Sequence, residues 1–177
     1  MDLSRISVGP NVPQEINIIT EVPMGGEPVK YEFDKAAGAI VVDRIIHTSM
    51  RYPCNYGFIP HTLGADGDPL DVLVAAGVPF IPGSVATVRP VGVLMMEDDK
   101  GGDEKLLCVP VDRLHPYYTN VDCYSDLPPI LIEQITHFFA HYKDLEDGKW
   151  VRIQGWEGVE TAERLILEAI ERARSAK

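Results

Sequence analysis

Hydrophobic and polar residues alternate over short segments through the first two thirds of the chain, as they do in β-strands. The alternation is clearest at 29–33, where three apolar side chains share one face and Lys30 and Glu32 share the other, which is expected to be solvated. The 14 prolines and 15 glycines separate these segments. The pattern predicts strands at 15–22, 29–33, 39–46, 72–75, 84–96, 106–111 and 150–154.

Three segments carry further expectations. Residues 39–46 are apolar enough to be buried on both faces, apart from an acidic residue and Arg44, which would need a partner. The strand at 84–96 should break at Pro90, because proline cannot donate a hydrogen bond to a neighbouring strand. Residues 52–60 begin and end near prolines and are expected to form a loop.

The last third of the chain changes to the helical period. Two prolines at 128–129 indicate a helix start, and the apolar residues that follow share one face. These residues are Leu131, Ile135, Phe138, Phe139 and Tyr142. A closing helix at about 159–174 directs Ala162, Ile166, Ala169, Ile170 and Ala173 inward. Helices that follow a series of strands predict a β-rich α+β fold, in a single domain over residues 1–177, with two main helices packed outside.

Composition and charge narrow the class of protein. With 45% hydrophobic and 24% charged residues the chain is globular, and no apolar run reaches the roughly 18 residues of a membrane span. Residues 1–17 lack the basic start and apolar centre of a signal peptide. The net charge of −11 would repel nucleic acid and anionic membranes. Cys54, Cys108 and Cys123 lack metal-ligand spacing, so we expect a cytoplasmic protein with free thiols and neither nucleic-acid nor membrane partners.

The segment 66–71, with the sequence DGDPLD, concentrates three carboxylates in six residues. Two like charges about 4 Å apart repel by roughly 4 kcal/mol at an effective dielectric near 20, so an ordered cluster implies a cation, a shared proton or full exposure to water. A polar turn is the simpler interpretation. Against it, Asp71 leads directly into the apolar strand at 72–75. An EF-hand loop that starts at Asp66 is excluded, because the ligands at its positions 5 and 12 would have to come from Leu70 and Gly77.

A second acidic run at 97–104 is expected to be a charged hairpin tip, and it too lies just before a strand. The polar residues near the ends of the predicted elements form two groups, carboxylates and hydrogen-bond donors. The carboxylates are Glu21, Glu32, Asp66, Asp68, Asp71, Asp98 and Asp103, and the donors are Lys30, Arg44, Tyr52, Tyr56, Lys105, Tyr142 and Lys143. If they converge, the oxygen ligands favour Mg²⁺, with Mn²⁺ as a substitute. Lysine and arginine among them suit a substrate with several phosphate oxygens.

Several motifs occur along the chain in a fixed order. They are E-V-P at Glu21, K-Y-E at Lys30, Y-P-x-N-Y-G-F-I-P at Tyr52, D-x-D-P-x-D-V at Asp66, D-x₄-D-x-K at Asp98 and H-Y-K-D-L at His141. In these motifs, which span nearly the whole chain, the sequence resembles soluble family I inorganic pyrophosphatases of the bacterial type. The resemblance implies a five-stranded, OB-like closed barrel with helices outside. It also implies hydrolysis of pyrophosphate to two phosphates with several Mg²⁺ ions, for which Mn²⁺ or Zn²⁺ are substitutes.

The resemblance further implies a role for each matching residue. Asp66, Asp71 and Asp103 would hold the first metal, with Asp71 bridging to a second. Asp98, Asp103 and Glu32 would surround ions that arrive with the substrate. Asp68 would orient and deprotonate the attacking water, while Lys30, Arg44, Tyr56, Lys105, Tyr142 and Lys143 would bind the phosphates. Among these, Lys30, Arg44 and Tyr56 are expected to be catalytic together with Asp68, and Glu21 and Tyr52 belong to the supporting shell. Asp99 is assigned no metal and Cys54 no nucleophilic role.

His137 and His141 are four residues apart, but Phe138 after the first excludes an H-E-x-x-H zinc motif. We expect both histidines to be packing or subunit-contact residues. The resemblance implies a homohexamer, with His137, His141 and Asp144 at a contact between subunits.

Two other functions are compatible with the sequence. One is a metal-dependent hydrolase of another phosphate ester or anhydride, which assays with pyrophosphate and ATP would separate. The other is an OB-type nucleic-acid-binding module without catalysis. Such a module should expose aromatic residues among basic ones, whereas Tyr52 and Tyr56 neighbour carboxylates.

Overall fold

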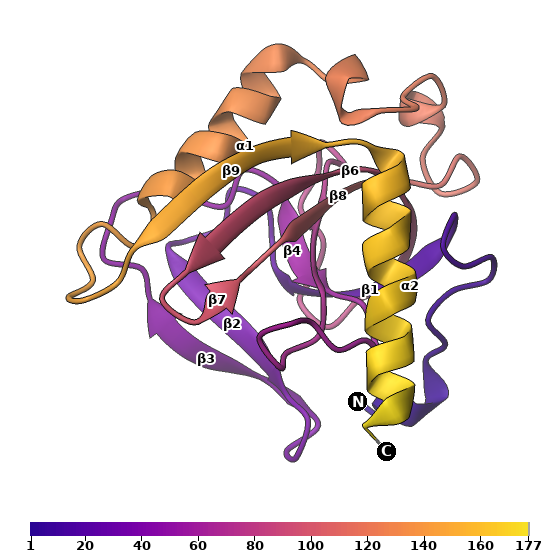
Figure 1. Ribbon diagram of the computed structural model, residues 1–177, viewed down its shortest axis with the longest axis horizontal. Helices are drawn as coiled ribbons and strands as arrows, with labels where there is room; N and C mark the ends of the chain where they lie inside the picture. The colour runs from indigo at the N-terminus through magenta and orange to yellow at the C-terminus, as the bar shows by residue number, and fades with distance from the viewer. Residues whose placement is uncertain (177) are drawn as a thin grey trace.

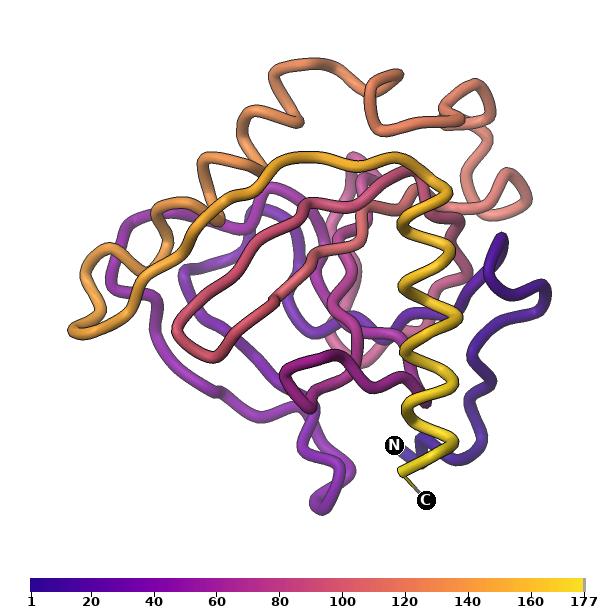
Figure 2. Tube along the Cα trace, viewed as in Figure 1, coloured from indigo at the N-terminus to yellow at the C-terminus, as the bar shows by residue number. Residues whose placement is uncertain are grey.

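The computed structural model describes residues 1–176, in which strands form a ring and two helices pack against its outside (Figures 1 and 2). The strands are β1 (Ile16–Val22), β2 (Val29–Asp34), β3 (Ala39–Ile45), β4 (Asn55–Phe58), β5 (Asp71–Val74), β6 (Val85–Asp98), β7 (Gly101–Gly102), β8 (Lys105–Pro110) and β9 (Val151–Glu157). The helices are α1 (Pro129–His141) and α2 (Val159–Ser175). Short 3-10 turns lie at Leu3–Arg5, Pro116–Tyr118 and Tyr124–Asp126.

Five strands pair with one another in a complete circuit. β1 pairs with β4, β4 with β5, β5 with β8, β8 with β6, and β6 again with β1. Only the β5–β8 pair is parallel among these five pairings. β7 and β9 extend the sheet beside β6, whereas β2 and β3 form a separate two-stranded sheet. The prediction of a β-rich fold with two outer helices is therefore confirmed.

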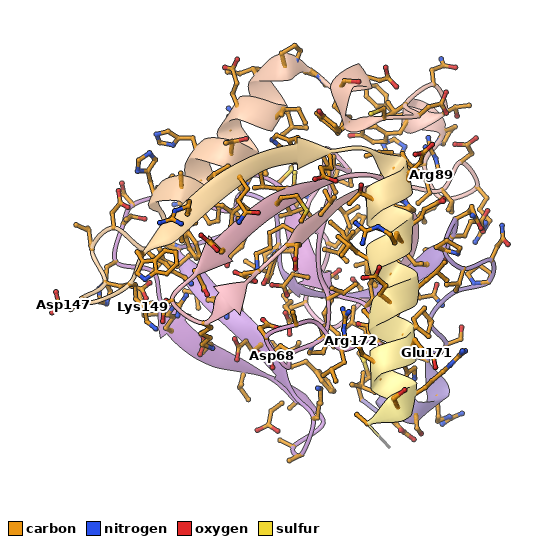
Figure 3. All side chains as sticks on the ribbon, in the orientation of Figure 1. Asp68, Arg89, Asp147, Lys149, Glu171 and Arg172 are labelled. Atoms are coloured by element: carbon orange, nitrogen blue, oxygen red, sulfur yellow. The ribbon has the colours of Figure 1, made fainter. Side chains whose placement is uncertain are left out.

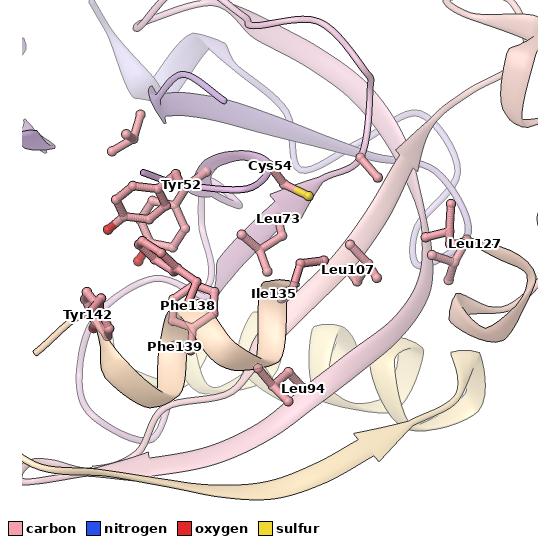
Figure 4. Packing of buried hydrophobic residues seen from close by; sticks show 14 of the residues in the cluster. Tyr52, Cys54, Leu73, Leu94, Leu107, Leu127, Ile135, Phe138, Phe139 and Tyr142 are labelled. Atoms are coloured by element: carbon pink, nitrogen blue, oxygen red, sulfur yellow. The ribbon is translucent and has the colours of Figure 1, made fainter. Parts of the chain in front are cut away.

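Each helix covers its own apolar cluster. The face of α1 that was predicted from spacing supplies Ile135, Phe138 and Phe139, which pack with Leu73 and Leu107 of the ring (Figure 4). α2 covers a second cluster with Ala162, Leu165, Ile166, Ala169 and Ile170. Alternate residues of β5 and β8 enter the two clusters, as the two-residue period of a strand requires. Full burial of such a side chain contributes about 1.5–3 kcal/mol, so both helices are held mainly by these faces.

A third, smaller cluster attaches the β2–β3 sheet to the ring. Ile19, Phe33 and Phe58 form its buried centre, and the Phe33 and Phe58 ring centroids are 6.1 Å apart. Leu3 and Ile6 from the N-terminal segment pack against them. The β2–β3 sheet is thus attached to the ring here by side-chain packing and not by strand pairing.

The prediction that 39–46 is buried on both faces is wrong. β3 pairs with β2 alone, outside the ring, and Val42 and Ile45 are 59% and 57% exposed. Hydrophobicity alone does not distinguish a strand buried on both faces from a strand of a two-stranded sheet with one face exposed.

Three strand assignments also differ from the predictions. β6 continues through Pro90, because the strand has a bulge between Pro90 and Gly92, where the pairing does not require a backbone N–H from the proline. The expected loop at 52–60 contains the buried strand β4. There Gly57 permits close contact with β1, since a Cβ at this position would lie 1.9 Å from the Ile19 carbonyl oxygen. The last strand, β9, is longer than the predicted 150–154.

Across residues 1–176, neither helix has the length and apolar character that a membrane crossing would require.

Candidate functional site

The predicted polar residues converge on one cavity of roughly 190 Å³. The carboxylates in its lining are Glu21, Glu32, Asp66, Asp68, Asp71, Asp98 and Asp103. The predicted donors in its lining are Lys30, Arg44, Tyr56, Lys105, Tyr142 and Lys143. Asp68 and Lys149, both labelled in Figure 3, come from distant parts of the chain and line this same cavity.

Different elements bring these residues together. The β2–β3 sheet supplies Lys30 and Arg44, which face each other in the register of the two strands. β5 and β8 supply Asp71 and Lys105, which are also paired in register. The segments before β5, around the β6–β7 hairpin and after α1 complete the lining. Local patterns place most of these groups near the ends of strands, but only the tertiary arrangement of the ring, the β2–β3 sheet and α1 brings them around one cavity.

Lys105 lies at the centre of the charge arrangement. Its Nζ donates to Asp71 Oδ2 at 2.5 Å and also to Asp103 Oδ1, and its side chain is only 2% exposed. Burial alone would lower the pKa of Lys105, but the charges of Asp71 and Asp103 outweigh burial and raise the pKa above its ordinary value. The ammonium therefore stays charged and neutralises part of the acidic cluster.

A second buried ion pair joins the β6–β7 hairpin to the segment after α1. Lys143 Nζ donates to Asp98 Oδ2 at 2.6 Å. Burial opposes ionisation of Asp98, yet the hydrogen bond from Lys143 and the Lys100 backbone N–H hold its pKa below the ordinary value. Asp98 is therefore ionised at neutral pH. Lys30 is paired in a similar way with Glu32 and, at 3.4 Å, with Asp43.

Glu21 differs from the other carboxylates of the cavity. Its Oε1 accepts the Phe33 backbone N–H at 2.7 Å, and the residue is buried. Burial, reinforced by the charge of Asp71, raises the pKa of Glu21 to about 8. The side chain is thus mostly protonated at neutral pH and connects β1 to β2.

Burial also keeps the cavity tyrosines protonated. It raises the pKa values of Tyr56 and Tyr142 well above the ordinary value, with Asp71 and Asp103 acting in the same direction. Their phenols can donate hydrogen bonds to an anion. Tyr52 does not line the cavity; it packs behind Tyr56 and against Phe138, with ring centroids 5.1 Å and 4.6 Å away.

The donor set fits a hard divalent cation. The metal-ligating groups in the lining are all carboxylates, which Mg²⁺ and Mn²⁺ prefer. A small hollow of about 10 Å³ is lined by Asp66, Asp71 and Asp103, the three residues expected to hold the first metal, and by Glu104. Within residues 1–176, however, no three such groups lie in a ready-made coordination arrangement. The ion pairs of Lys105 with Asp71 and Asp103 account for this, because the ammonium occupies the position between two of the carboxylates.

The structure adds cationic residues that the sequence analysis did not select. Lys35, Lys100 and Lys149 also line the cavity, and Lys149 Nζ pairs with Asp99 Oδ2 at 2.6 Å. Lys35 follows β2 and Lys100 lies in the β6–β7 turn, where charged residues commonly serve only solubility. None of the three occupies a specified position of a motif, so the sequence did not indicate that these side chains line the cavity.

The buried positions of Tyr52 and Tyr56, 2% and 5% exposed, bear on the alternative functions. Rings that stack on nucleic-acid bases must be accessible, and these two are not. The cavity instead combines carboxylates, cationic side chains and phenols. These are the kinds of group that a site for phosphate oxygens and divalent cations requires.

Comparisons with known proteins agree with this class. A family model described as inorganic pyrophosphatase matches residues 18–174. The chain is 61% identical to the inorganic pyrophosphatase of Bradyrhizobium diazoefficiens over 177 residues, which cover 100% of this chain and 99% of the relative. It superimposes on an inorganic phosphatase from Anaplasma phagocytophilum with a TM-score of 0.94 and 51% identity, covering 96% and 99% of the two chains. The inorganic pyrophosphatase of Thermus thermophilus superimposes with a TM-score of 0.93 and is 40% identical in sequence, and the match covers 98% of this chain and 99% of that one. The chain belongs to the inorganic pyrophosphatase family.

Proposed function

We propose that the protein hydrolyses inorganic pyrophosphate to two orthophosphates, with the cavity as the active site. The main support for this activity is membership of the inorganic pyrophosphatase family, because the match extends over the whole chain. The convergence of the predicted carboxylates and phosphate ligands on one cavity supports its location. A hydrolase of phosphoanhydride bonds needs both kinds of group together.

The carboxylates of the cavity hold several Mg²⁺ ions in this proposal. Asp66, Asp71 and Asp103 would hold the first metal and Asp71 would also serve a second, while Asp98, Asp103 and Glu32 would serve ions that accompany the substrate. Bound divalent cations supply Lewis acidity that polarises phosphoryl oxygens and acidifies water. Mn²⁺ and Zn²⁺ are the proposed substitutes. Lys105, which contacts two of these carboxylates, lies where it can pass from a carboxylate to a phosphate oxygen.

Asp68 is the proposed general base. Among the described residues its carboxylate forms no ion pair, whereas those of Asp71, Asp98 and Asp103 each contact an ammonium group. An unpaired, exposed carboxylate beside the cavity is free to orient a water molecule and accept its proton. The backbone N–H of Asp68 donates to Asp66 Oδ1 at 3.1 Å, which fixes the loop that carries it.

The donors bind the two phosphate groups. Lys30, Lys105 and Lys143 provide ammonium groups and Arg44 a guanidinium, while Tyr56 and Tyr142 provide phenolic hydroxyls. Charge that spreads over the phosphoryl oxygens in the transition state is stabilised by donors already in place. Glu21 and Tyr52 support these residues from behind.

Phosphate release tests the proposal directly. The purified protein should release phosphate from pyrophosphate with Mg²⁺ present, and excess chelator should abolish the release. With ATP in place of pyrophosphate, the rate should be far lower. A protein that is folded by circular dichroism yet inactive on pyrophosphate with Mg²⁺ would overturn the activity. Preference for ATP would favour the broader phosphoanhydride hydrolase.

The assembly is proposed to be a homohexamer in which α1 contributes to a subunit contact. His137 and His141 lie exposed on α1 with ring centroids 4.6 Å apart, and His141 Nδ1 lies 2.8 Å from Asp144 Oδ2. Exposed, mutually oriented polar residues of this kind suit a contact between identical helices. A monomeric mass in solution would contradict the proposal.

The chain is further proposed to be a single domain with an OB-like closed barrel and to lie in the cytoplasm. Numbered in chain order, the five ring strands follow the circuit 1-2-3-5-4-1, which supports an OB-like closed barrel. The family match from residue 18 to residue 174 supports a single domain. The free thiols of Cys54, Cys108 and Cys123 support a reducing, cytoplasmic environment.

A further inference from the structure

Glu146 lies in the turn after α1 and contacts Arg44 of β3. Its Oε1 is 3.5 Å from Arg44 Nε, and its side chain is 12% exposed. Within residues 1–176, these two atoms are the buried side-chain nitrogen and oxygen atoms that lack a hydrogen-bond partner. Buried polar atoms are normally satisfied, so a pair of unsatisfied atoms that face each other calls for a physical reason.

Glu146 lies behind Arg44 with respect to the cavity. Arg44 lines the cavity, and Glu146 is not part of the lining. The separation of 3.5 Å is a few tenths of an ångström beyond the N–H···O range of about 2.7–3.2 Å. A small movement of the guanidinium would therefore complete the hydrogen bond. Arg44 is held loosely in this arrangement, with its charge already compensated.

Backbone hydrogen bonds fix the turn that carries Glu146. The Glu146 N–H donates to the Lys143 carbonyl at 2.9 Å, and the Lys149 N–H donates to the Glu146 carbonyl at 3.2 Å. A second contact joins the same two parts of the chain, since His47 Nδ1 lies 3.3 Å from the Leu145 carbonyl oxygen. Glu146 thus projects from a turn whose neighbouring residues include the phosphate ligand Lys143.

We propose that Glu146 is a positioning residue for Arg44. Its carboxylate holds Nε, so that the two terminal amino groups of the guanidinium point into the cavity as a fork for a phosphate of pyrophosphate. The Nε–H to Glu146 hydrogen bond closes when the phosphate is bound. This inference rests on the proposed phosphate-binding role of Arg44 but adds a residue that does not touch the substrate.

A double-mutant cycle tests the proposal with kcat and KM for pyrophosphate at saturating Mg²⁺. Glu146→Ala should lower kcat/KM about tenfold, because losing a hydrogen bond to a charged group typically has an effect of at least this size. KM should rise by a larger factor than kcat falls. Glu146→Gln should lose less, because its amide oxygen can still accept from Nε. In an Arg44→Lys background, Glu146→Ala should cause little further loss, because lysine has no Nε–H donor at that position.

Several outcomes decide the matter. Unchanged kinetics in Glu146→Ala and Glu146→Gln, or an equal loss in wild type and in Arg44→Lys, would overturn the positioning role. An inactive wild-type protein in the same assay would instead overturn the proposed activity. Glu27→Gln is the matched control, because it removes an exposed ion pair with Arg51, 3.2 Å apart, away from the cavity, and should leave kinetics unchanged. Thermal melts identify any variant that fails to fold, and the isosteric Glu146→Gln then supplies the comparison.

Discussion

At the scale of single residues, the charges of the cavity depend on one another. Lys105 is almost fully buried and remains charged only because Asp71 and Asp103 contact it. Removing one partner of such a pair leaves an uncompensated buried charge, which is far more costly than the pair is stabilising. The acidic and basic residues are therefore best regarded as one unit that exchanges partners when substrate and cations bind.

Glu21 gives a prediction for the pH dependence of stability. Its pKa is about 8 in the folded protein and about 4.5 when unfolded, so the folded state binds more protons between these values. The free energy of unfolding should consequently fall as pH rises from about 4.5 to 8, by at most about 1.4 kcal/mol per pH unit from this group. In Glu21→Gln, which keeps an acceptor for the Phe33 N–H, that slope should be lost.

Denaturant melts at several pH values between 5 and 9, in excess chelator, would measure the effect. Relative to wild type, Glu21→Gln should be more stable at the alkaline end than at the acidic end. Glu168→Gln, which removes an exposed ion pair with Arg164 on α2, serves as the control and should follow the wild-type curve. Parallel curves for wild type and Glu21→Gln would mean that Glu21 is not protonated in the folded protein.

Residues in motifs were predicted well from the sequence, whereas residues outside motifs were not. Every residue predicted to bind metal or phosphate lines the cavity, and so does Glu21 of the predicted supporting shell, whereas Tyr52 of that shell does not. The individual roles of these residues stay predictions. Lys35 and Lys149 line it as well, yet both lie in turns where lysine is ordinary. Glu146 was missed for a related reason, since its contact with Arg44 joins segments about a hundred residues apart. Local spacing carries no information about such a contact.

At the scale of elements, the β2–β3 sheet is the least integrated part of the site. It pairs with no strand of the ring and is attached through Phe33, Phe58 and the Glu21 hydrogen bond. It nevertheless carries Lys30 and Arg44. It also contacts the turn after α1 through Arg44 and Glu146, and the segment after β3 contacts the same turn through His47 and Leu145. The proposed phosphate ligands of this sheet are thus held by a few specific contacts rather than by a continuous sheet.

β4 shows why element boundaries were harder to predict than helices. The helix faces repeat over three turns or more, but β4 has four residues between prolines and contains a glycine. Those residues favour a loop when read locally. The strand forms because β1 and β5 supply partners on both sides, which is a property of the ring. Propensity in short segments is overridden by such tertiary pairing.

Gly57→Ala should therefore disrupt this part of the ring. Its new Cβ would lie 1.9 Å from the Ile19 carbonyl oxygen and 2.8 Å from the carbonyl carbon, so β1 and β4 must separate. We expect a loss of stability of at least about 1–3 kcal/mol, the usual range for overpacking, and reduced activity because Tyr56 is the adjacent residue. Urea denaturation would measure the loss.

Gly158→Ala provides the comparison for this substitution. Gly158 precedes α2 with a φ of −80°, and nothing lies within 4 Å of the added Cβ. The Gly158→Ala variant should lose no more than about 1 kcal/mol, because alanine is a poorer N-cap than glycine but meets no steric clash here. If Gly57→Ala were as stable as Gly158→Ala, the close approach of β1 and β4 would be contradicted.

At the scale of the whole molecule, the charge of the cavity differs from that of the surface. The chain carries a net charge of −11. The cavity, by contrast, is lined by seven acidic and seven basic residues, counted from its lining, and Glu21 is mostly protonated. A polyanion such as pyrophosphate is thus repelled by most of the surface and attracted at one place. Lysines at the rim should matter most before the substrate is bound, when only long-range forces act.

Lys35 permits a test of this attraction, because it is exposed and lines the cavity without pairing to a predicted ligand. Lys35→Gln should lower kcat/KM for pyrophosphate about two- to threefold at low ionic strength and leave kcat unchanged. The deficit relative to wild type in the same buffer should shrink as salt rises, since the screening length falls to roughly 3 Å at 1 M. Arg174→Gln removes an exposed positive charge on α2, away from the cavity, and should show no such dependence. A deficit in Lys35→Gln that persisted at high salt would instead indicate direct contact between Lys35 and the substrate.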